Sequence, residues 1–291
     1  MALMLAAPPF ASTDIMALTA LAPVSTETRD YQLKDFRGIS VSGSVRVVYT
    51  QDKAFSVSLS ARADMLDRVD VSVKHGILTV KHRREAKPGN PRRNNRHDRN
   101  CDVVLRVSAP LLSAIALSGA SLFETGQMTT HDLTATVSGA SKFHADVLEC
   151  SVLTLTLQGA STADVDVTVC TDCHVSAQGA SHVKMSKVTG TGQARWAATG
   201  ASHLDVMDAG HKSCDVSLTG ASRGTVRLHS SRVAISAAGA SRLAAHVHCS
   251  ALTAQSSGTS SIDLSGKAGK VKTTLGSTSA SISTRHLQRA D

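Results

Sequence analysis

Two aspartates with a lysine midway between them come closest to a reactive site in this chain. Asp164, Lys184 and Asp205 follow one another at steps of 20 and 21 residues, and His182 and His203 are 21 residues apart. If one step equals one layer of a stacked structure, the two carboxylates lie two layers apart, about 9.6 Å at ordinary strand spacing. Carboxylates at a separation of that order suit an inverting glycoside hydrolase or a site for a divalent cation.

The step of about 20 residues belongs to most of the chain, because a Gly-Ala-Ser tripeptide returns at nearly constant intervals. Seven copies follow one another at steps of 19 to 21 residues, and altered copies follow at Gly258 and Gly276. Self-similarity at this period is typical of solenoid proteins. The glycines of the seven copies are Gly119, Gly139, Gly159, Gly179, Gly200, Gly220 and Gly239, and their serines are Ser121, Ser141, Ser161, Ser181, Ser202, Ser222 and Ser241.

The residues on either side of the tripeptide indicate which secondary structure each repeat contains. Counted from the glycine, positions −4, −2 and +4 are almost always apolar, as in Leu155, Leu157 and Phe143. A spacing of two is that of a β-strand, whereas a helix places its apolar residues three and four apart. Leucine-rich repeats have a similar length, but their regular leucine and asparagine pattern is absent. We therefore predict an all-β protein that forms a parallel β-helix with coils of about 20 residues.

The repeated tripeptide suits a sharp corner in each coil. Glycine reaches backbone angles that a side chain forbids, and the serines are expected to form a column about 4.8 Å apart along the stack. Each serine hydroxyl can donate one hydrogen bond and accept others from the coils above and below. Because an active site is normally a single place, we interpret the seven glycines and serines as structural corners.

The repeat also gives the aspartate cluster a second interpretation. Outward positions of a solenoid must be polar in any case, and alternating charges on stacked strands are favoured by cross-strand pairing. We favour a solvated face at these five residues and keep a catalytic or metal site as the alternative. No serine, histidine and aspartate triad is recognisable, and no phosphate-binding glycine loop precedes a helix. We expect neither a cofactor nor a bound metal.

The positive charge of the chain is concentrated in one segment. The net charge is +8, and residues 81–100 alone carry +6 together with two prolines. This composition predicts a mobile basic loop that attaches weakly to polyanions. Aromatic residues make up only 3% of the chain, so the stacking platforms of nucleic-acid-binding surfaces are missing. We expect no specific nucleic-acid partner.

Six cysteines are too few for a disulfide scaffold in a chain of 291 residues. Cys173 and Cys214 share repeat position −6 with aliphatic residues and lie two coils apart, which predicts buried, unpaired thiols. Cys150 and Cys170 occupy the same repeat position in adjacent coils. Their spacing allows a disulfide bond but does not require one. Cys170 and Cys173 form a C-x-x-C sequence, but it lies in a strand rather than at a helix start, which disfavours a redox or zinc role.

The part of the chain before the repeats contains two sections. Residues 1–30 are apolar and poor in charge, and Ala20-Leu21-Ala22 has the form of a signal-peptidase site, although no lysine or arginine precedes it. We interpret this section as a leader, signal-like or disordered, and favour export. Residues 31–110 form alternating strands that are expected to cap the solenoid, and residues 111–291 form its repeat coils within one continuous domain. No run of eighteen apolar residues is present, so no membrane span is predicted.

Several short motifs stand out along the chain. They are Phe36-Arg37-Gly38-Ile39 with Gly43, a strand from Gly76, Val107-Ser108-Ala109-Pro110-Leu111, and Ser118-Gly119-Ala120-Ser121 after Ile115. Together they resemble the head GIN domain family of auto-transporter adhesins. The resemblance covers about residues 31–285. It implies a right-handed β-helix in an exported protein of the bacterial cell envelope, and it brings no catalytic residues.

Two functional hypotheses follow. The first is a non-enzymatic adhesin or interaction scaffold in the periplasm, at the outer membrane surface or outside the cell, with glycans or proteins of the envelope or of a host as partners. The alternative is a β-helical lyase or hydrolase of polysaccharides that uses Asp164 and Asp205. The strongest patterns in the chain all serve the coil, and no isolated position breaks them, so we favour the first.

Overall fold

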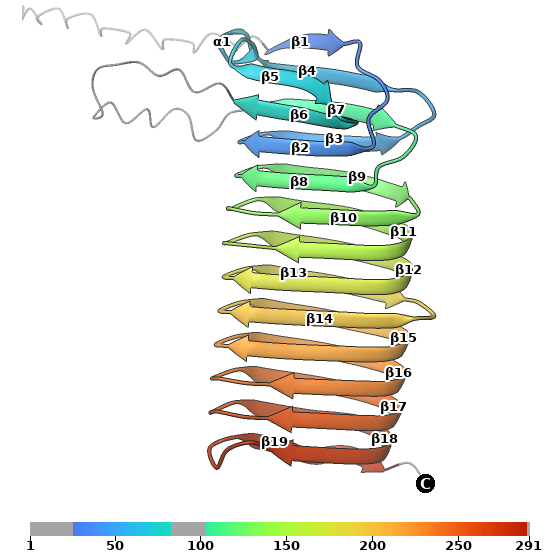
Figure 1. Cartoon of the computed structure of the whole chain (residues 1–291), viewed down its shortest axis with the longest axis vertical. Coiled ribbons are helices and arrows are strands. Elements are labelled where there is room, and N and C mark those ends of the chain that lie inside the picture. The colour runs from blue at the N-terminus through green and yellow to red at the C-terminus, as the bar shows by residue number, and fades with distance from the viewer. Residues whose placement is uncertain (1–25, 83–102, 290–291) are drawn as a thin grey trace, which may run out of the picture.

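The structure is a computed structural model that describes residues 26–82 and 103–289. It is a tall stack of β-coils with very little helix (Figure 1). Most of the expected leader and most of the expected basic loop lie outside the described residues. Within the described part of the chain, no helix is long and apolar enough to cross a lipid bilayer. The fold is therefore the all-β solenoid that the repeat predicts.

The regular coils occupy residues 114–289. Their strands are β8 (Ala114–Gly119), β9 (Leu122–Thr129), β10 (Asp132–Val137), β11 (Lys142–Leu157), β12 (Thr162–Gly179), β13 (His182–Thr189), β14 (Gln193–Gly200), β15 (His203–Gly220), β16 (Arg223–Ala237), β17 (Arg242–Ser256), β18 (Ser261–Leu275) and β19 (Ser281–Arg289). Neighbouring coils pair in parallel, so that Leu155 of β11 lies between Ala135 of β10 and Val175 of β12. Several coils, such as β12 and β15, are one long strand that bends once and closes at the tripeptide.

The N-terminal part both extends the stack and covers its end. Its elements are β1 (Thr26–Tyr31), β2 (Gly38–Gly43), β3 (Arg46–Gln51), β4 (Ser56–Arg62), α1 (Ala63–Leu66), β5 (Val69–Lys74), β6 (Ile77–His82) and β7 (Val104–Ala109). β2 and β3 pair in parallel with β8 and β9 on one side, and with β6 and β7 on the other. The antiparallel pairs β1–β4, β4–β7 and β5–β6 give the strand edges at this end hydrogen-bonding partners.

Three details of this region were not part of the prediction. β1 begins at Thr26, inside the expected leader, because its backbone pairs with the edge of β4. The coil of β2 and β3 lies between those of β6–β7 and β8–β9, so the chain builds the cap and then returns past its own first coil (Figure 1). The four-residue helix α1 was not expected, and it buries Met65 and Leu66 against the cap.

The apolar columns predicted from the repeat form the core. Leu155, Leu157 and Phe143, which represent positions −4, −2 and +4, are each 1% exposed or less. Phe143 stacks on Phe123 of the preceding coil, with ring centroids 5.4 Å apart. Burial of such side chains stabilises each coil by about 1.5–3 kcal/mol per residue. The outward positions between them are left free to carry polar groups.

Candidate functional site

The glycine corner, formed by the seven Gly-Ala-Ser tripeptides, has a geometry that requires glycine. All seven glycines have φ between +75° and +85°, and a Cβ at Gly179 would lie 2.8 Å from the Gly159 carbonyl oxygen of the preceding coil. The serine hydroxyls bond mainly to backbone rather than to one another, because carbonyl oxygens lie closer. Ser222, for example, donates toward the Thr219 oxygen at 2.7 Å and the Gly200 oxygen at 3.3 Å. Its hydroxyl is buried and engaged within the fold.

The aspartate cluster forms a ladder across neighbouring strands of one outer face. Asp164 of β12 lies opposite Lys184 of β13, which lies opposite Asp205 of β15, and His182 lies opposite His203. Lys184 Nζ is 3.4 Å from Asp164 Oδ1, and His182 Nε2 is 3.6 Å from Asp205 Oδ2. The two imidazole rings stack with centroids 5.4 Å apart. The structure thus brings all five predicted residues together.

The contacts of this ladder are those of a charge-paired surface. The two aspartates and their partners Lys184 and His182 keep side-chain exposures between 26% and 47%. A glycosidase general acid needs a carboxyl group that a buried, apolar environment keeps protonated, whereas both carboxylates here lie beside an ammonium or imidazole group. Within the described ranges, no group of three or more His, Cys, Asp or Glu is placed to hold a metal ion. What the geometry provides is a set of surface ion pairs, each worth at most about 1 kcal/mol.

A basic stripe runs along the same face, three residues after the corner glycine. It consists of His182, His203, Arg223 and Arg242, which are register partners in four successive coils. Neighbouring members are one strand spacing apart, about 4.8 Å. His182 has Asp205 as a partner, but no acidic group of the described residues pairs with either arginine. Sequence reasoning singled out only the two histidines, although the constant +3 position was a usable pattern for all four.

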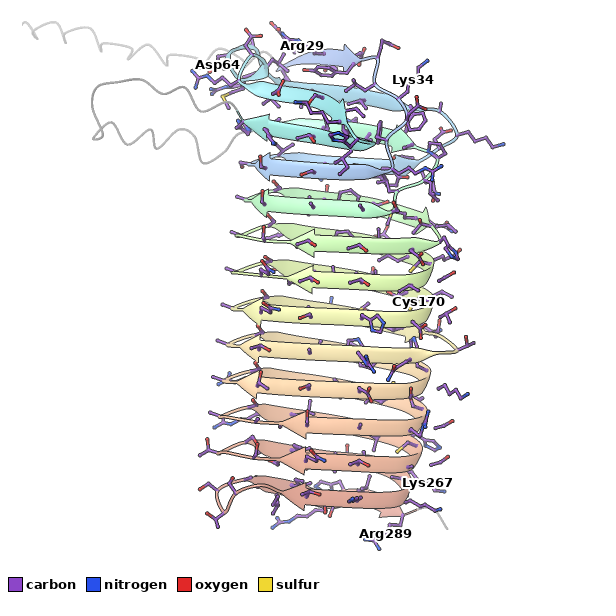
Figure 2. The ribbon with its side chains drawn as sticks, in the orientation of Figure 1. Arg29, Lys34, Asp64, Cys170, Lys267 and Arg289 are labelled. Atoms are coloured by element: carbon purple, nitrogen blue, oxygen red, sulfur yellow. The ribbon has the colours of Figure 1, made fainter. Side chains whose placement is uncertain are left out.

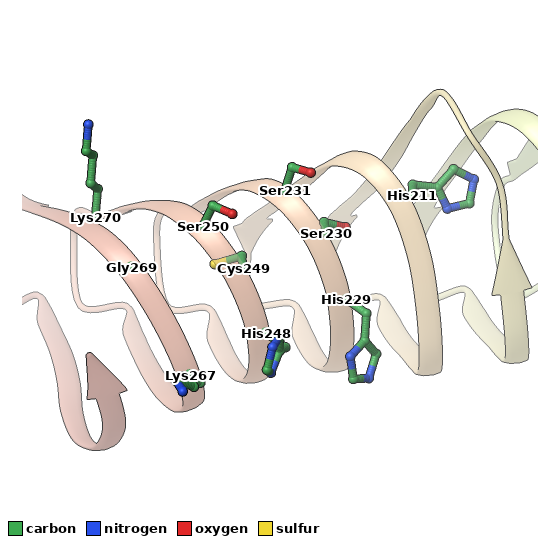
Figure 3. Close-up of a pocket in the computed structure, with 10 residues that line it drawn as sticks. All are labelled: His211, His229, Ser230, Ser231, His248, Cys249, Ser250, Lys267, Gly269 and Lys270. Carbon is green, nitrogen blue, oxygen red and sulfur yellow. The ribbon is translucent and has the colours of Figure 1, made fainter. Parts of the chain in front are cut away.

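Sequence reasoning also missed a hollow at the bend of the C-terminal coils. It has a volume of about 840 Å³ (Figure 3). His229, His248 and Lys267 are register partners along one side of it, whereas Lys270 points away on the opposite side. His229 Nε2 is 3.5 Å from Asp208 Oδ1. The basic groups do not converge, so the hollow is an open surface feature. The sequence does contain a signal for its basic side, because His229, His248 and Lys267 follow one another at steps of 19 residues.

The second corner, defined as the bend that carries Cys170 and its partners in neighbouring coils, is lined from inside by thiols. The described cysteines, all of them unpaired, are Cys150, Cys170, Cys173, Cys214 and Cys249. Cys150 lies opposite Cys170, as the repeat predicts. Cys173 and Cys214 are buried and separated by the coil of Ala194, which confirms their prediction as buried, unpaired thiols. Figure 2 places Cys170 and Lys267 along the same edge of the stack.

The pattern of one protein family matches residues 35–227. That family is described as "Putative auto-transporter adhesin, head GIN domain". No curated protein is similar enough to the chain to match it. The matched segment begins after β1 and includes the basic stripe as far as Arg223, but not Arg242.

Three solved structures share the fold at low sequence identity. A "putative adhesin" from Parabacteroides distasonis has a TM-score of 0.63 and 13% identity, covering 90% of this chain and 98% of its own. A "putative lipid binding protein" from the same organism has a TM-score of 0.61 and 13% identity, covering 91% and 97%. A "putative adhesin" from Parabacteroides merdae has a TM-score of 0.60 and 12% identity, covering 91% and 96%. At such identities the likeness concerns the fold alone.

Proposed function

The chain belongs to the head GIN domain family, and we propose that it is an exported interaction scaffold that binds acidic groups along one face without turning over a substrate. The observation that carries this proposal is the basic stripe of His182, His203, Arg223 and Arg242. The adhesin description of the family and of two similar structures supports a role at a surface. The apolar segment that ends in Ala20-Leu21-Ala22 supports export.

The stripe suits a polymer with repeating negative charges. A basic side chain on each rung, about 4.8 Å from the next, offers one contact per layer to a chain that lies along the stack, and the two arginines are permanently charged. Guanidinium groups bind carboxylate and sulfate in a bidentate manner, and Arg223 and Arg242 have no acidic partner within the described residues. The preferred partners are therefore acidic glycans of an envelope or host surface.

Neutral sugars are a poorer fit, because they are usually held by exposed aromatic rings. Within the described ranges, Tyr31 and Phe55 are partly buried against the N-terminal end of the core, and the other aromatic residues are fully buried, namely Phe36, Tyr49, Phe123, Phe143 and Trp196. The outer face thus offers charge and hydrogen bonds rather than stacking. This favours recognition by electrostatics, which weakens as salt concentration rises.

The proposal of a non-enzymatic role rests on the aspartate ladder. Asp164 and Asp205 are the best carboxylate pair for glycosidic chemistry, yet each is partly exposed and contacts Lys184 or His182, whereas a glycosidase general acid lies in a buried, apolar environment. A lyase or hydrolase remains the competing hypothesis. It requires that replacing one of these aspartates abolishes cleavage while the fold persists.

A binding panel tests the stripe. The full chain is applied to immobilised sulfated, carboxylated and neutral glycans, beside the variant Arg223→Ser/Arg242→Ser. Its matched control is Lys74→Ser/Lys272→Ser, which removes the same charge from exposed positions outside the stripe. We expect retention on acidic glycans only, and a loss of at least tenfold in affinity for the stripe variant alone. Equal losses in both variants would mean that net charge, not the stripe, drives binding.

Fractionation of cells that express the full chain tests export separately. We expect the protein in the envelope fraction or the medium, with a mature N-terminus near Ala22. Retention of the whole chain in the cytoplasm would contradict export while leaving the binding result unaffected.

A further inference from the structure

The second corner breaks the apolar rule of the solenoid interior. Five of six successive coils place a polar or sulfur-containing side chain in its column and the sixth places a glycine, whereas the −4, −2 and +4 columns are almost wholly apolar. Read along the stack, the column is Cys150, Cys170, Gly190, His211, Ser230 and Cys249. Departures from a structural pattern are where function is expected to override fold.

The middle of this column brings an imidazole to a thiol across an intervening coil. Cys170 Sγ lies 3.9 Å from His211 Nε2, although the two residues belong to coils that are not neighbours. Both are nearly buried, with exposures of 3% and 4%. The rings of His211 and Trp196 also form a T-shaped contact, with centroids 6.3 Å apart at 89°, so the imidazole is held from a second side.

Gly190 makes this contact sterically feasible. A Cβ at that position would lie 2.0 Å from the Cys170 carbonyl oxygen and 2.3 Å from His211 Nε2. Contacts this short do not occur between real atoms, so any side chain at position 190 would displace the imidazole or the backbone. The contact between Cys170 and His211 therefore depends on glycine at position 190.

Cys173 supplies a second thiol beside Cys170. It is fully buried, and its hydrogen bond to the Cys170 sulfur is the main cause that lowers the pKa of Cys170, to about 6, with a further contribution from His211. The same hydrogen bond and burial raise the pKa of Cys173 well above its usual value. One sulfur of the pair is thus prepared to be a nucleophile, and the other keeps its proton.

The remaining thiols lack this arrangement. Burial raises the pKa of Cys150 to about 12 and that of Cys214 to about 11, and it also raises the pKa of Cys249. Cys214 Sγ lies 2.9 Å from the Ser230 hydroxyl, which is a neutral partner. These three cysteines serve as internal controls for Cys170.

We propose that Cys170 is a peroxide-reactive thiol with Cys173 as its resolving partner, and that His211 is the residue that positions the reactive sulfur. The site is a reversible oxidation site within the stack. It is independent of glycan binding by the basic stripe. Because Cys170 is only 3% exposed, small reagents reach its sulfur most readily, and hydrogen peroxide is such a reagent.

The chemistry balances with hydrogen peroxide as the only oxidant. The Cys170 thiolate attacks one peroxide oxygen, the O–O bond breaks, and the leaving hydroxide takes up a proton to become water. The Cys173 sulfur then attacks the sulfur of the Cys170 sulfenic acid, the S–S bond forms, and the S–O bond breaks. The hydroxide leaves with the proton of Cys173 as a second water. The two thiols lose two electrons, and the peroxide gains them.

Peptide mapping tests this pairing directly. The full chain is reduced with dithiothreitol, desalted, treated with hydrogen peroxide, blocked with iodoacetamide and cleaved before aspartate. The three candidate cysteines then fall on separate peptides, 146–163, 166–171 and 172–204. We expect a loss of two hydrogens and a link between 166–171 and 172–204, which dithiothreitol reverses. A link between 146–163 and 166–171, or no loss of two hydrogens, would overturn the proposal.

Three variants extend the test. Cys173→Ala should trap the sulfenic acid, so that dimedone, added together with urea after the peroxide has been removed, labels Cys170 and not Cys249. The pH midpoint for alkylation of Cys170 should rise in His211→Leu and less in His211→Gln, which retains a nitrogen near Nε2. At pH 7 Cys170 should be alkylated at least tenfold faster than Cys249. Equal rates for the two thiols would also refute the assignment, and this comparison needs only the unaltered chain.

Discussion

Arg223 and Arg242 lie directly opposite each other in neighbouring parallel strands. Like charges in facing positions destabilise a sheet, and within the described residues neither arginine has an acidic partner that offsets the repulsion. Elsewhere on the same face, Asp164 and Lys184 are facing residues with opposite charges, and so are Lys184 and Asp205. The stripe therefore retains an unfavourable pair where a stabilising one was available, which is expected of a binding surface.

Arg242→Glu should separate stability from binding. The change replaces a repulsive pair by an attractive one, so the free energy of unfolding should rise by roughly 0.2–1 kcal/mol, while affinity for acidic glycans falls. Urea unfolding and glycan retention measure the two effects. Lys272→Glu makes the same charge change opposite the neutral Thr253 and should alter binding much less. A less stable Arg242→Glu protein would mean that this arginine serves the fold.

The glycine corner should tolerate no side chain. Gly179→Ala places a Cβ 2.8 Å from the Gly159 carbonyl oxygen at a φ of +83°, so it should destabilise the protein by more than about 1 kcal/mol. Gly210→Ala is the matched control, because the nearest atom to its Cβ, the His229 carbonyl oxygen, is 3.9 Å away. A lower urea midpoint is expected for the first variant only. Similar midpoints for both would contradict the steric account of the corner.

Inward and outward substitutions should differ sharply. Leu155→Asp buries an unpaired carboxyl group at a position that is 1% exposed. Even in its neutral form such a group costs about 2–7 kcal/mol, so the change should unfold the surrounding coils. Asp164→Asn removes only a partly exposed ion pair and should change stability by less than about 1 kcal/mol. Circular dichroism and urea midpoints measure both. A large loss on Asp164→Asn would show that the ladder is a structural requirement.

The buried hydroxyl of Tyr49 should make the protein less stable at high pH. Its hydroxyl donates to the Ala109 carbonyl oxygen at 2.9 Å, and burial raises the pKa of Tyr49 to about 12. Because the folded pKa lies above the unfolded value of about 10, its contribution is complete below pH 10 and is lost as the pH rises toward 12. The urea midpoint should fall over this range, and it should fall less in Tyr49→Phe. An equal fall in both proteins would assign the effect to other groups.

Much of the fold could be predicted because the repeat states each structural requirement many times. Position −4 is apolar in Leu155, Val175 and Val216 alike, so one repeat with a different residue would not change the prediction that this position faces inward. The cap has no such redundancy. Nothing in the residues of β2 indicates that its coil lies between that of β6 and that of β8, since this depends on pairing between segments far apart in the chain.

The sites were only partly predictable for a related reason. The aspartate ladder follows from spacing alone, and the structure places its five residues together. The contact between Cys170 and His211 depends instead on the direction of one imidazole along the stack and on the missing side chain of Gly190. Spacing shows that these three residues share a column. It does not show that the side chains of Cys170 and His211 reach each other across the coil of Gly190.

Size-exclusion chromatography of an acidic glycan incubated with the protein tests the central claim, which is binding through the basic stripe without turnover. The glycan is followed by a label at one end, so that one run reports both complex formation and chain length. We predict that it elutes with the unaltered protein, elutes free with Arg223→Ser/Arg242→Ser, and keeps its full length in both cases. Shorter glycan fragments that disappear with Asp164→Asn or Asp205→Asn would contradict the account and establish an enzyme.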